Sequence, residues 1–181
     1  MKKAINCFIP YDNEQSVQRT IASLQQSERV AQIYLLATNS DKEEIAGCPI
    51  IRIDTPNSTE TFQQIAQLAD TRYTLLYVKT SPLELGYRAL ERMTDYLIEG
   101  ETTLVYSDYY EWKGGELIPH PVIDYQLGSV RDDFDFGSVL LFDSNTLKEG
   151  VLALNKQENY HYAALYALRL FASHQIGRAH V

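Results

Sequence analysis

The sequence predicts an α/β protein whose mainly parallel sheet lies between two layers of helices. An apolar run ends at Pro10, a polar turn follows, and Val17, Ile21 and Leu24 then recur at helical spacing. Along the rest of the chain, short apolar segments bounded by turns alternate with helical patterns. The 181 residues are enough for one domain with a full core, and no apolar run approaches the ~18 residues that span a bilayer.

The first elements are a strand over residues 4–9 and a helix over residues 15–24. Pro10 has no amide hydrogen for a sheet ladder, so the strand is expected to end there. Asp12 is the predicted cap of the helix, with Gln15 three residues later able to reach back to it. Since α/β sheets bind ligands at the carboxyl ends of their strands, the loop between these elements is expected to line a ligand crevice.

The middle of the chain continues the alternation of strands and helices. Residues 32–37 and 49–53 are predicted to be short buried strands bounded by turns. Asn57 followed by Glu60 is a capping signature and predicts the start of the second helix there. Residues 73–78 (YTLLYV) are predicted to form the next buried strand.

A third helix and two further strands are expected after this point. Ser81, Pro82 and Glu84 provide an N-cap, a proline at the first helical position and a glutamate at the third, which predicts a helix start. Residues 103–112 and 137–142 are expected to be strands, separated by an irregular segment rich in proline, glycine and aspartate. The predicted order is β-α-β-β-α-β-α-β, a loop, then β-α-α.

Composition limits the classes of partner. A formal net charge of -8 without any basic stripe argues against binding to nucleic acid. Cys7 and Cys48 lie in apolar, strand-like surroundings without metal or redox spacing, so we expect reduced core thiols. The apolar run after the first three residues is too short for a signal peptide, which predicts a cytoplasmic protein.

The last six residues, 176–181 (IGRAHV), differ in character from the rest of the chain. They follow the periodic helix expected over residues 160–173 and contain no helix-ending signal. One reading frame of a widely used sequencing adapter translates to these six residues. We therefore expect a domain over residues 1–175 that is incomplete at its C-terminus, with 176–181 as an artefact; the alternative is a genuine tail.

The opening segment, residues 5–24 (INCFIPYDNEQSVQRTIASL), resembles the start of family 2 glycosyltransferases, which have the GT-A nucleotide-diphospho-sugar fold. Weaker likenesses follow in order over residues 65–77, at Pro82 with Leu90, and over residues 137–142 and 166–170. Together they cover nearly the whole of residues 1–175. The shared residues of the first motif are Ile9, Pro10, Tyr11, Asn13, Glu14, Ile21, Ser23 and Leu24.

The resemblance implies a transferase that takes a sugar from a nucleotide-sugar donor, of UDP type, with inversion at the anomeric carbon. The implied acceptor is a glycan or a lipid-linked molecule, and a missing C-terminal part could bring the enzyme to a membrane surface. The family's acidic turn after the second strand is replaced by Thr38 and Asn39, which can still hydrogen-bond a base. The donor-binding residues implied are Pro10, Tyr11, Asn13, Glu14, Thr38 and Asn39.

Two family motifs are absent from this sequence. The metal-binding Asp-x-Asp should fall at residues 78–80, which are Val-Lys-Thr, and the Glu-Asp pair should fall near residues 162–163. Divalent cations on a diphosphate require carboxylate oxygens, so we expect no metal ligands and doubt a divalent-cation cofactor. Lys79 could replace the cation beside the helix N-terminus expected at Ser81. The alternative is a catalytically inactive relative that binds a sugar nucleotide or a partner protein.

Several aspartates are candidates for the general base that deprotonates the acceptor hydroxyl. Asp108 follows a buried strand, and Asp132, Asp133 and Asp135 precede the strand at 137–142. Asp108, Asp132 and Asp133 are the selected catalytic candidates; the competing interpretation is a solvated loop of paired charges. A nucleotidyltransferase of similar fold is a third hypothesis, although the opening loop lacks the glycine- and arginine-rich stretch of such enzymes.

Overall fold

The computed structural model describes residues 3–100, 102–125, 134–157, 159–172 and 176–179. Eight strands form one sheet in the order β10-β6-β9-β5-β1-β2-β4-β3, and two more form a separate hairpin. The strands of the large sheet are β1 (Ile5–Pro10), β2 (Val30–Ala37), β3 (Glu44–Ile45), β4 (Cys48–Arg52), β5 (Tyr73–Tyr77), β6 (Leu104–Ser107), β9 (Val139–Asp143) and β10 (Ile176–Ala179).

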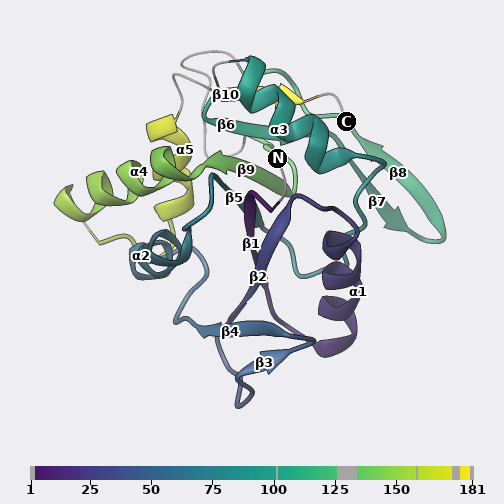
Figure 1. Cartoon of the computed structure of the whole chain (residues 1–181), viewed down its shortest axis with the longest axis horizontal. Helices are drawn as coiled ribbons and strands as arrows, with labels where there is room; N and C mark the ends of the chain where they lie inside the picture. The colour runs from purple at the N-terminus through teal and green to yellow at the C-terminus, as the bar shows by residue number, and fades with distance from the viewer. Residues whose placement is uncertain (1–2, 101, 126–133, 158, 173–175, 180–181) are drawn as a thin grey trace.

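The large sheet is mainly parallel, as the sequence predicts. β1 pairs in parallel with both β2 and β5, with Cys7 opposite Ile33 on one side and Leu75 on the other. β9 is antiparallel to its neighbours β5 and β6, and β3 is antiparallel to β4. The connections from β1 to β2, from β4 to β5 and from β5 to β6 each contain a helix, which gives the three-layer arrangement of Figure 1, whereas β3 connects β2 to β4.

Helices cover both faces of the sheet (Figure 1). The helices α1 (Glu14–Gln25) and α3 (Ala89–Glu99) pack on one face, and α2 (Thr59–Leu68), α4 (Ser144–Gln157) and α5 (Ala164–Phe171) pack on the other. Each face has its own apolar core, because the side chains of the strands alternate between the two sides. Cys7 and Cys48 are both buried and unpaired, which confirms the expected core thiols.

The start of α3 differs from the prediction. The capping signal at Ser81 and Pro82 does not begin a helix, and α3 starts only at Ala89. In the intervening segment, the Leu83 amide donates to Thr20 Oγ1 at 3.0 Å and the Leu85 amide to Ser23 Oγ at 2.8 Å. These hydrogen bonds to hydroxyls of α1 hold the segment out of the helix, so tertiary contacts override a local propensity.

Two helix caps lie one residue later than predicted. Asn13 caps α1, since it has an extended backbone and its Oδ1 accepts from the Ser16 amide at 2.9 Å; Asp12 lies just outside the cap. Ser58 takes the same role in α2, with its Oγ accepting from the Thr61 amide at 3.2 Å. In both cases, the polar residue directly before the first helical turn is the one that caps.

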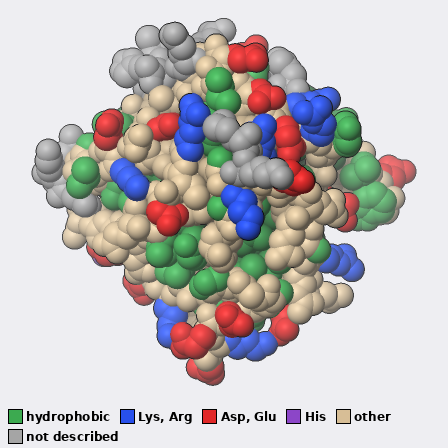
Figure 2. All heavy atoms as spheres, viewed as in Figure 1, with side chains coloured by type: hydrophobic (Ala, Val, Ile, Leu, Met, Phe, Trp, Pro, Cys, Tyr) green, Lys and Arg blue, Asp and Glu red, His purple; other side chains and the backbone are tan. Residues whose placement is uncertain are grey.

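The strand predicted over residues 103–112 is interrupted at Asp108. β6 ends at Ser107, and β7 (Tyr109–Lys113) leaves the sheet to pair with β8 (Glu116–His120) as a hairpin at the right of Figure 1. Trp112 lies opposite Leu117 and Tyr110 opposite Pro119, so one face of the hairpin is apolar. Tyr110, Trp112 and Leu117 are exposed, and Figure 2 shows hydrophobic side chains gathered at this edge.

The C-terminal residues 176–179 form the edge strand β10, parallel to β6. The artefact interpretation of residues 176–181 stays a prediction, because strand pairing does not test the origin of these residues. Within the described ranges, no helix has the length and apolar character needed to cross a membrane.

Candidate functional site

The polar residues singled out in the sequence gather at one edge of the large sheet. β1, β2, β5 and β6 run in the same direction, so the segments that follow them, at Tyr11, Thr38, Lys79 and Asp108, emerge at their shared carboxyl edge. β9 is antiparallel, so Gly137 and the residues before it approach this edge from the other direction. The described part of the predicted site is therefore brought together at the place that the fold class favours.

The loop after β1 is held closely to the sheet. Pro10 lies opposite Leu36 in the last register position, and the Tyr11 amide donates to the Leu36 carbonyl at 2.8 Å. The Tyr11 side chain is half-buried and packs against the core beneath α1. Thr38 and Asn39 follow β2 and are exposed at the same edge.

Two predicted donor-binding residues have structural partners. Asn13 Oδ1 is occupied by the helix cap. The Glu14 carboxylate is in ion-pair contact with Lys42 Nζ, and it accepts from Gln18 Nε2 at 3.1 Å. The Glu14 hydrogen bond and charge raise the pKa of Lys42 above its usual value. Any contact of Asn13 or Glu14 with a donor stays a prediction.

We predict that Asn13 contributes to stability more than to ligand binding. Asn13→Ala should lower the free energy of unfolding by about 1 kcal/mol, because the Ser16 amide loses its acceptor. Asn13→Ser retains a capping oxygen and should keep most of this stability. Urea denaturation measures both variants, and equal loss in the alanine and serine variants would contradict a capping role.

Lys79 lies in the loop directly after β5 and is half-buried. This loop is fixed from two sides, since the Val78 amide donates to the Ser138 carbonyl at 3.0 Å and Ser16 Oγ donates to the Thr80 carbonyl at 2.7 Å. Ser16 belongs to the first turn of α1. The helix N-terminus beside Lys79 is therefore that of α1, whereas the sequence predicted one at Ser81.

The Lys79 ammonium lies over an aromatic ring. Its Nζ is 4.2 Å from the ring centroid of Tyr109, the first residue of β7. The Tyr109 hydroxyl donates to Asp135 Oδ2 at 3.4 Å, and the His120 imidazole stacks on the Tyr109 ring at 4.9 Å with an angle of 6° between the planes. His120 Nε2 is in turn 3.3 Å from Glu111 Oε2.

The aspartates considered as catalytic candidates differ in their surroundings. Asp108 is half-buried at the end of β6, and its Oδ1 accepts from the Val122 amide at 2.8 Å. Asp132 and Asp133 lie outside the described residues. Asp135 is exposed, and its Oδ1 accepts from the Gly137 amide at 2.7 Å.

A second cation contacts the segment before β9. The Arg169 guanidinium, on α5, packs on the Phe136 ring with 4.7 Å between Cζ and the ring centroid. Burial lowers the pKa of Arg169 to about 10, and the nearby Asp135 charge opposes this shift. The segment 135–137 thus contacts Arg169 through Phe136 and Tyr109 through Asp135.

Neither Tyr109, which contacts Lys79, nor His120, which stacks on Tyr109, was singled out from the sequence. The pattern over residues 103–112 predicted a continuous strand there, without the hairpin that places His120 opposite Tyr109. The available signal was Gly114-Gly115, a glycine pair that favours a two-residue hairpin turn; both glycines have positive φ, of 62° and 89°. Within the described ranges, no group of three or more His, Cys, Asp or Glu could hold a metal ion.

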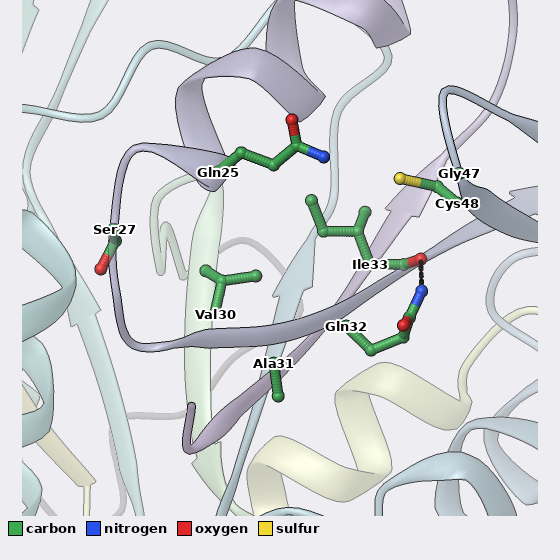
Figure 3. A pocket seen from close by; sticks show the side chains of 8 residues that line it. All are labelled: Gln25, Ser27, Val30, Ala31, Gln32, Ile33, Gly47 and Cys48. Carbon is green, nitrogen blue, oxygen red and sulfur yellow. Dashed lines mark hydrogen bonds between the residues drawn. The ribbon is translucent and has the colours of Figure 1, made fainter. Parts of the chain in front are cut away.

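A pocket of about 180 Å³ lies at the opposite edge of the sheet, where β2 begins (Figure 3). The end of α1, the start of β2 and the turn between β3 and β4 form its walls. It contains none of the residues predicted to bind a donor or to act in catalysis. The residues around it are Gln25, Ser27, Val30, Ala31, Gln32, Ile33, Gly47 and Cys48.

Comparison with known proteins finds similar structures but no similar sequences. No family model matches the chain. No curated protein sequence matches it either. Among solved structures, a 4-diphosphocytidyl-2C-methyl-D-erythritol synthase from Anaerococcus prevotii superposes with a TM-score of 0.64 at 10% identity, over 98% of this chain and 89% of that one.

Two further structures have the same architecture. Glucosyl-3-phosphoglycerate synthase from Mycobacterium tuberculosis, in complex with Mn²⁺, UDP and glucosyl-3-phosphoglycerate, gives a TM-score of 0.58 at 11% identity, over 98% of this chain and 70% of that one. The bifunctional IspDF from Campylobacter jejuni gives a TM-score of 0.58 at 10% identity, and this chain spans 50% of its length. At such identities the similarity shows the fold: the predicted three-layer α/β sheet of GT-A type is confirmed.

Proposed function

We propose that this chain is a glycosyltransferase that moves a sugar from a UDP-type nucleotide donor to a glycan or lipid-linked acceptor, without a divalent cation. The observation that carries the proposal is the position of Lys79. It follows β5 at the carboxyl edge of the sheet, beside the first turn of α1. The similarity in fold to a synthase solved with UDP supports the choice of donor.

The charges at this position suit a diphosphate. As UDP leaves, negative charge grows on the bridging and terminal phosphate oxygens and needs a fixed positive partner. An ammonium group provides a full charge, and the amides at the start of α1 add the partial positive charge of a helix N-terminus. Lys79 would thus do at the donor diphosphate what a metal ion does in enzymes that retain Asp-x-Asp.

The remaining donor contacts are assigned from the same edge. Pro10 and Tyr11 would form one wall of the donor pocket, and Thr38 and Asn39 would hydrogen-bond the base from the end of β2. Asn13 and Glu14 would contribute through α1, whose start they form. These residues lie at the strand ends where α/β sheets hold their ligands, or at the start of the adjoining helix, which supports the assignment.

The proposed chemical step is a single displacement. The acceptor hydroxyl attacks the anomeric carbon, its proton passes to a carboxylate, and the bond from the sugar to UDP breaks. Asp108, Asp132 and Asp133 are the candidates for this carboxylate. Asp108 lies at the end of β6, and its Oδ1 already accepts one backbone hydrogen bond, which would fix its orientation.

The experiment is to incubate the protein with a panel of UDP-sugars and to measure UDP release and donor binding. We expect donor binding and slow donor hydrolysis that EDTA changes by less than about twofold, since an ammonium supplies the positive charge. Loss of activity in EDTA with recovery in Mn²⁺ would contradict the metal-independent mechanism. Turnover of a nucleoside triphosphate with a sugar phosphate would instead indicate a nucleotidyltransferase.

A second candidate is a catalytically inactive protein that binds a sugar nucleotide. It is favoured by the structural partners of three predicted site residues: Asn13 caps α1, Glu14 contacts Lys42, and Asp108 binds the Val122 amide. This candidate predicts that UDP-sugars bind but that no UDP is released, even with a broad panel of acceptors. The same incubation therefore separates the two functions.

A further inference from the structure

Tyr109 packs against the core and also contacts three polar side chains at the candidate site. It is the first residue after Asp108, where the chain leaves the large sheet and enters the hairpin. One contact of its ring is with the Lys79 ammonium, at 4.2 Å, and another is with His120, at 4.9 Å. The hydroxyl points to the Asp135 carboxylate.

A lysine at a loop position would otherwise sample many conformations. Its charge is carried by a compact ammonium on a flexible four-carbon chain, so little in its own structure fixes its place. The face of an aromatic ring is the negative part of its quadrupole and attracts such a cation. A ring that is itself immobile therefore selects the lysine conformers that place the ammonium over it.

The Tyr109 ring is immobilised by its own partners. Its hydroxyl donates to Asp135, and Asp135 is tied to the backbone by the Gly137 amide at 2.7 Å. Burial, and then the Asp135 charge, raise the pKa of the Tyr109 hydroxyl, which favours its protonated, donating form. His120 stacks with its plane within 6° of the Tyr109 plane and lies directly opposite it in the hairpin.

We propose that Tyr109 is a positioning residue that holds the Lys79 ammonium at the place where the donor diphosphate binds. This proposal rests on the proposed function, because it assigns the Lys79 ammonium to the diphosphate. The ring does not contact the reacting atoms. It restricts the conformations of Lys79 before the ligand binds, and this lowers the entropic cost of binding. The hairpin then supplies the residues that position Lys79, with Tyr109 and His120 paired at its base.

The test is a double-mutant cycle with UDP as the probe and the full chain as the protein. Tyr109→Leu removes the ring and should weaken UDP binding about fivefold. In a Lys79→Met background, the same Tyr109→Leu change should have no further effect, because the group that it positions is gone. Tyr109→Phe keeps the ring face and should bind UDP within about twofold of the wild type.

Lys79→Arg gives a second measurement that leaves Tyr109 in place. A guanidinium also stacks on aromatic rings, so this variant should retain most UDP binding, whereas Lys79→Met should not. If Tyr109→Leu does not fold, by circular dichroism, Tyr109→Met takes its place in the cycle, because it also lacks a ring but keeps more of the side-chain bulk; equal UDP binding by Tyr109→Met and the wild type would overturn the positioning role.

The outcomes separate this proposal from the proposed function. If Lys79→Met weakens UDP binding but Tyr109→Leu does not, only the positioning role is overturned. Equal weakening by Tyr109→Leu in both backgrounds would also overturn it, since the ring would then act independently of Lys79. If the wild type fails to bind UDP, or binds it as well as Lys79→Met does, the assignment of Lys79 to the diphosphate fails and the positioning role falls with it.

Discussion

Gly137→Ala is expected to lower the free energy of unfolding by about 2–4 kcal/mol, the largest effect on stability that we predict. Gly137 has φ of 71°, which is unfavourable for a residue with a Cβ atom. A Cβ added there would lie 2.6 Å from the Ser107 carbonyl oxygen, which is a backbone atom and cannot rotate away. Backbone strain and steric overlap therefore both lower the free energy of unfolding. The alanine also makes the unfolded chain less flexible, which offsets only a small part of this loss.

The same change should loosen the candidate site. The added Cβ would also lie 3.5 Å from Cδ1 of the Tyr109 ring, and the Gly137 amide is the donor that fixes Asp135. Movement of this segment would therefore shift Asp135 and the Tyr109 ring, which hold Lys79 in place. Weaker UDP binding should accompany the lower stability.

Thermal denaturation measures the effect, which corresponds to a fall in Tm of roughly 5–15 °C for a domain of this size. Gly86→Ala is the matched control, because Gly86 has no atom near an added Cβ and no positive φ. The control should change stability by less than about 0.5 kcal/mol. If both glycine variants had the same Tm as the wild type, the close approach of residue 137 to Ser107 would be wrong.

Lys79→Met is expected to weaken UDP binding about 10- to 100-fold, the largest effect on function that we predict. The methionine side chain has similar length but no charge, so the diphosphate loses a charge-assisted hydrogen bond. Stability should change little, because the variant loses only a partly exposed cation–π contact with Tyr109. Isothermal titration with UDP measures the change in Kd.

Lys148→Met is the control for the loss of one positive charge. Lys148 lies on α4, which packs against the other face of the sheet from α1. Its replacement should leave the Kd for UDP within about twofold, since a charge on the other side of the sheet is largely screened in physiological salt. An equal loss of affinity in both lysine variants would indicate a general charge effect and would contradict a specific role for Lys79.

Local signals predicted those parts of the fold where neighbouring residues decide the structure. The strand that ends at Pro10 and the helix with Val17, Ile21 and Leu24 on its inner face form as expected. The start of α3 could not be predicted in this way. Ser81 and Pro82 form a strong local signal, but the hydroxyls of α1, more than sixty residues earlier in the chain, bind the amides that follow.

The candidate site was predictable only in part for the same reason. Lys79 could be placed because it directly follows a buried strand, and strand ends meet at one edge. Its contact with Tyr109 depends on the break at Asp108, which carries no distinct signal in a segment with strand-like composition throughout. Asp135 was visible as one of several acidic residues, but only the Gly137 turn and the Tyr109 hydroxyl distinguish it from the others.

The central claim is that a nucleotide donor binds at the carboxyl edge of the sheet, beside Lys79. Titration of ¹⁵N-labelled protein with UDP, followed by amide chemical shifts, tests this claim most directly. We expect shifts at Tyr11, Thr38 and Lys79, and none at Val30 or Cys48 in the pocket of the opposite edge. Shifts confined to that pocket, or no shifts at millimolar UDP, would contradict the claim.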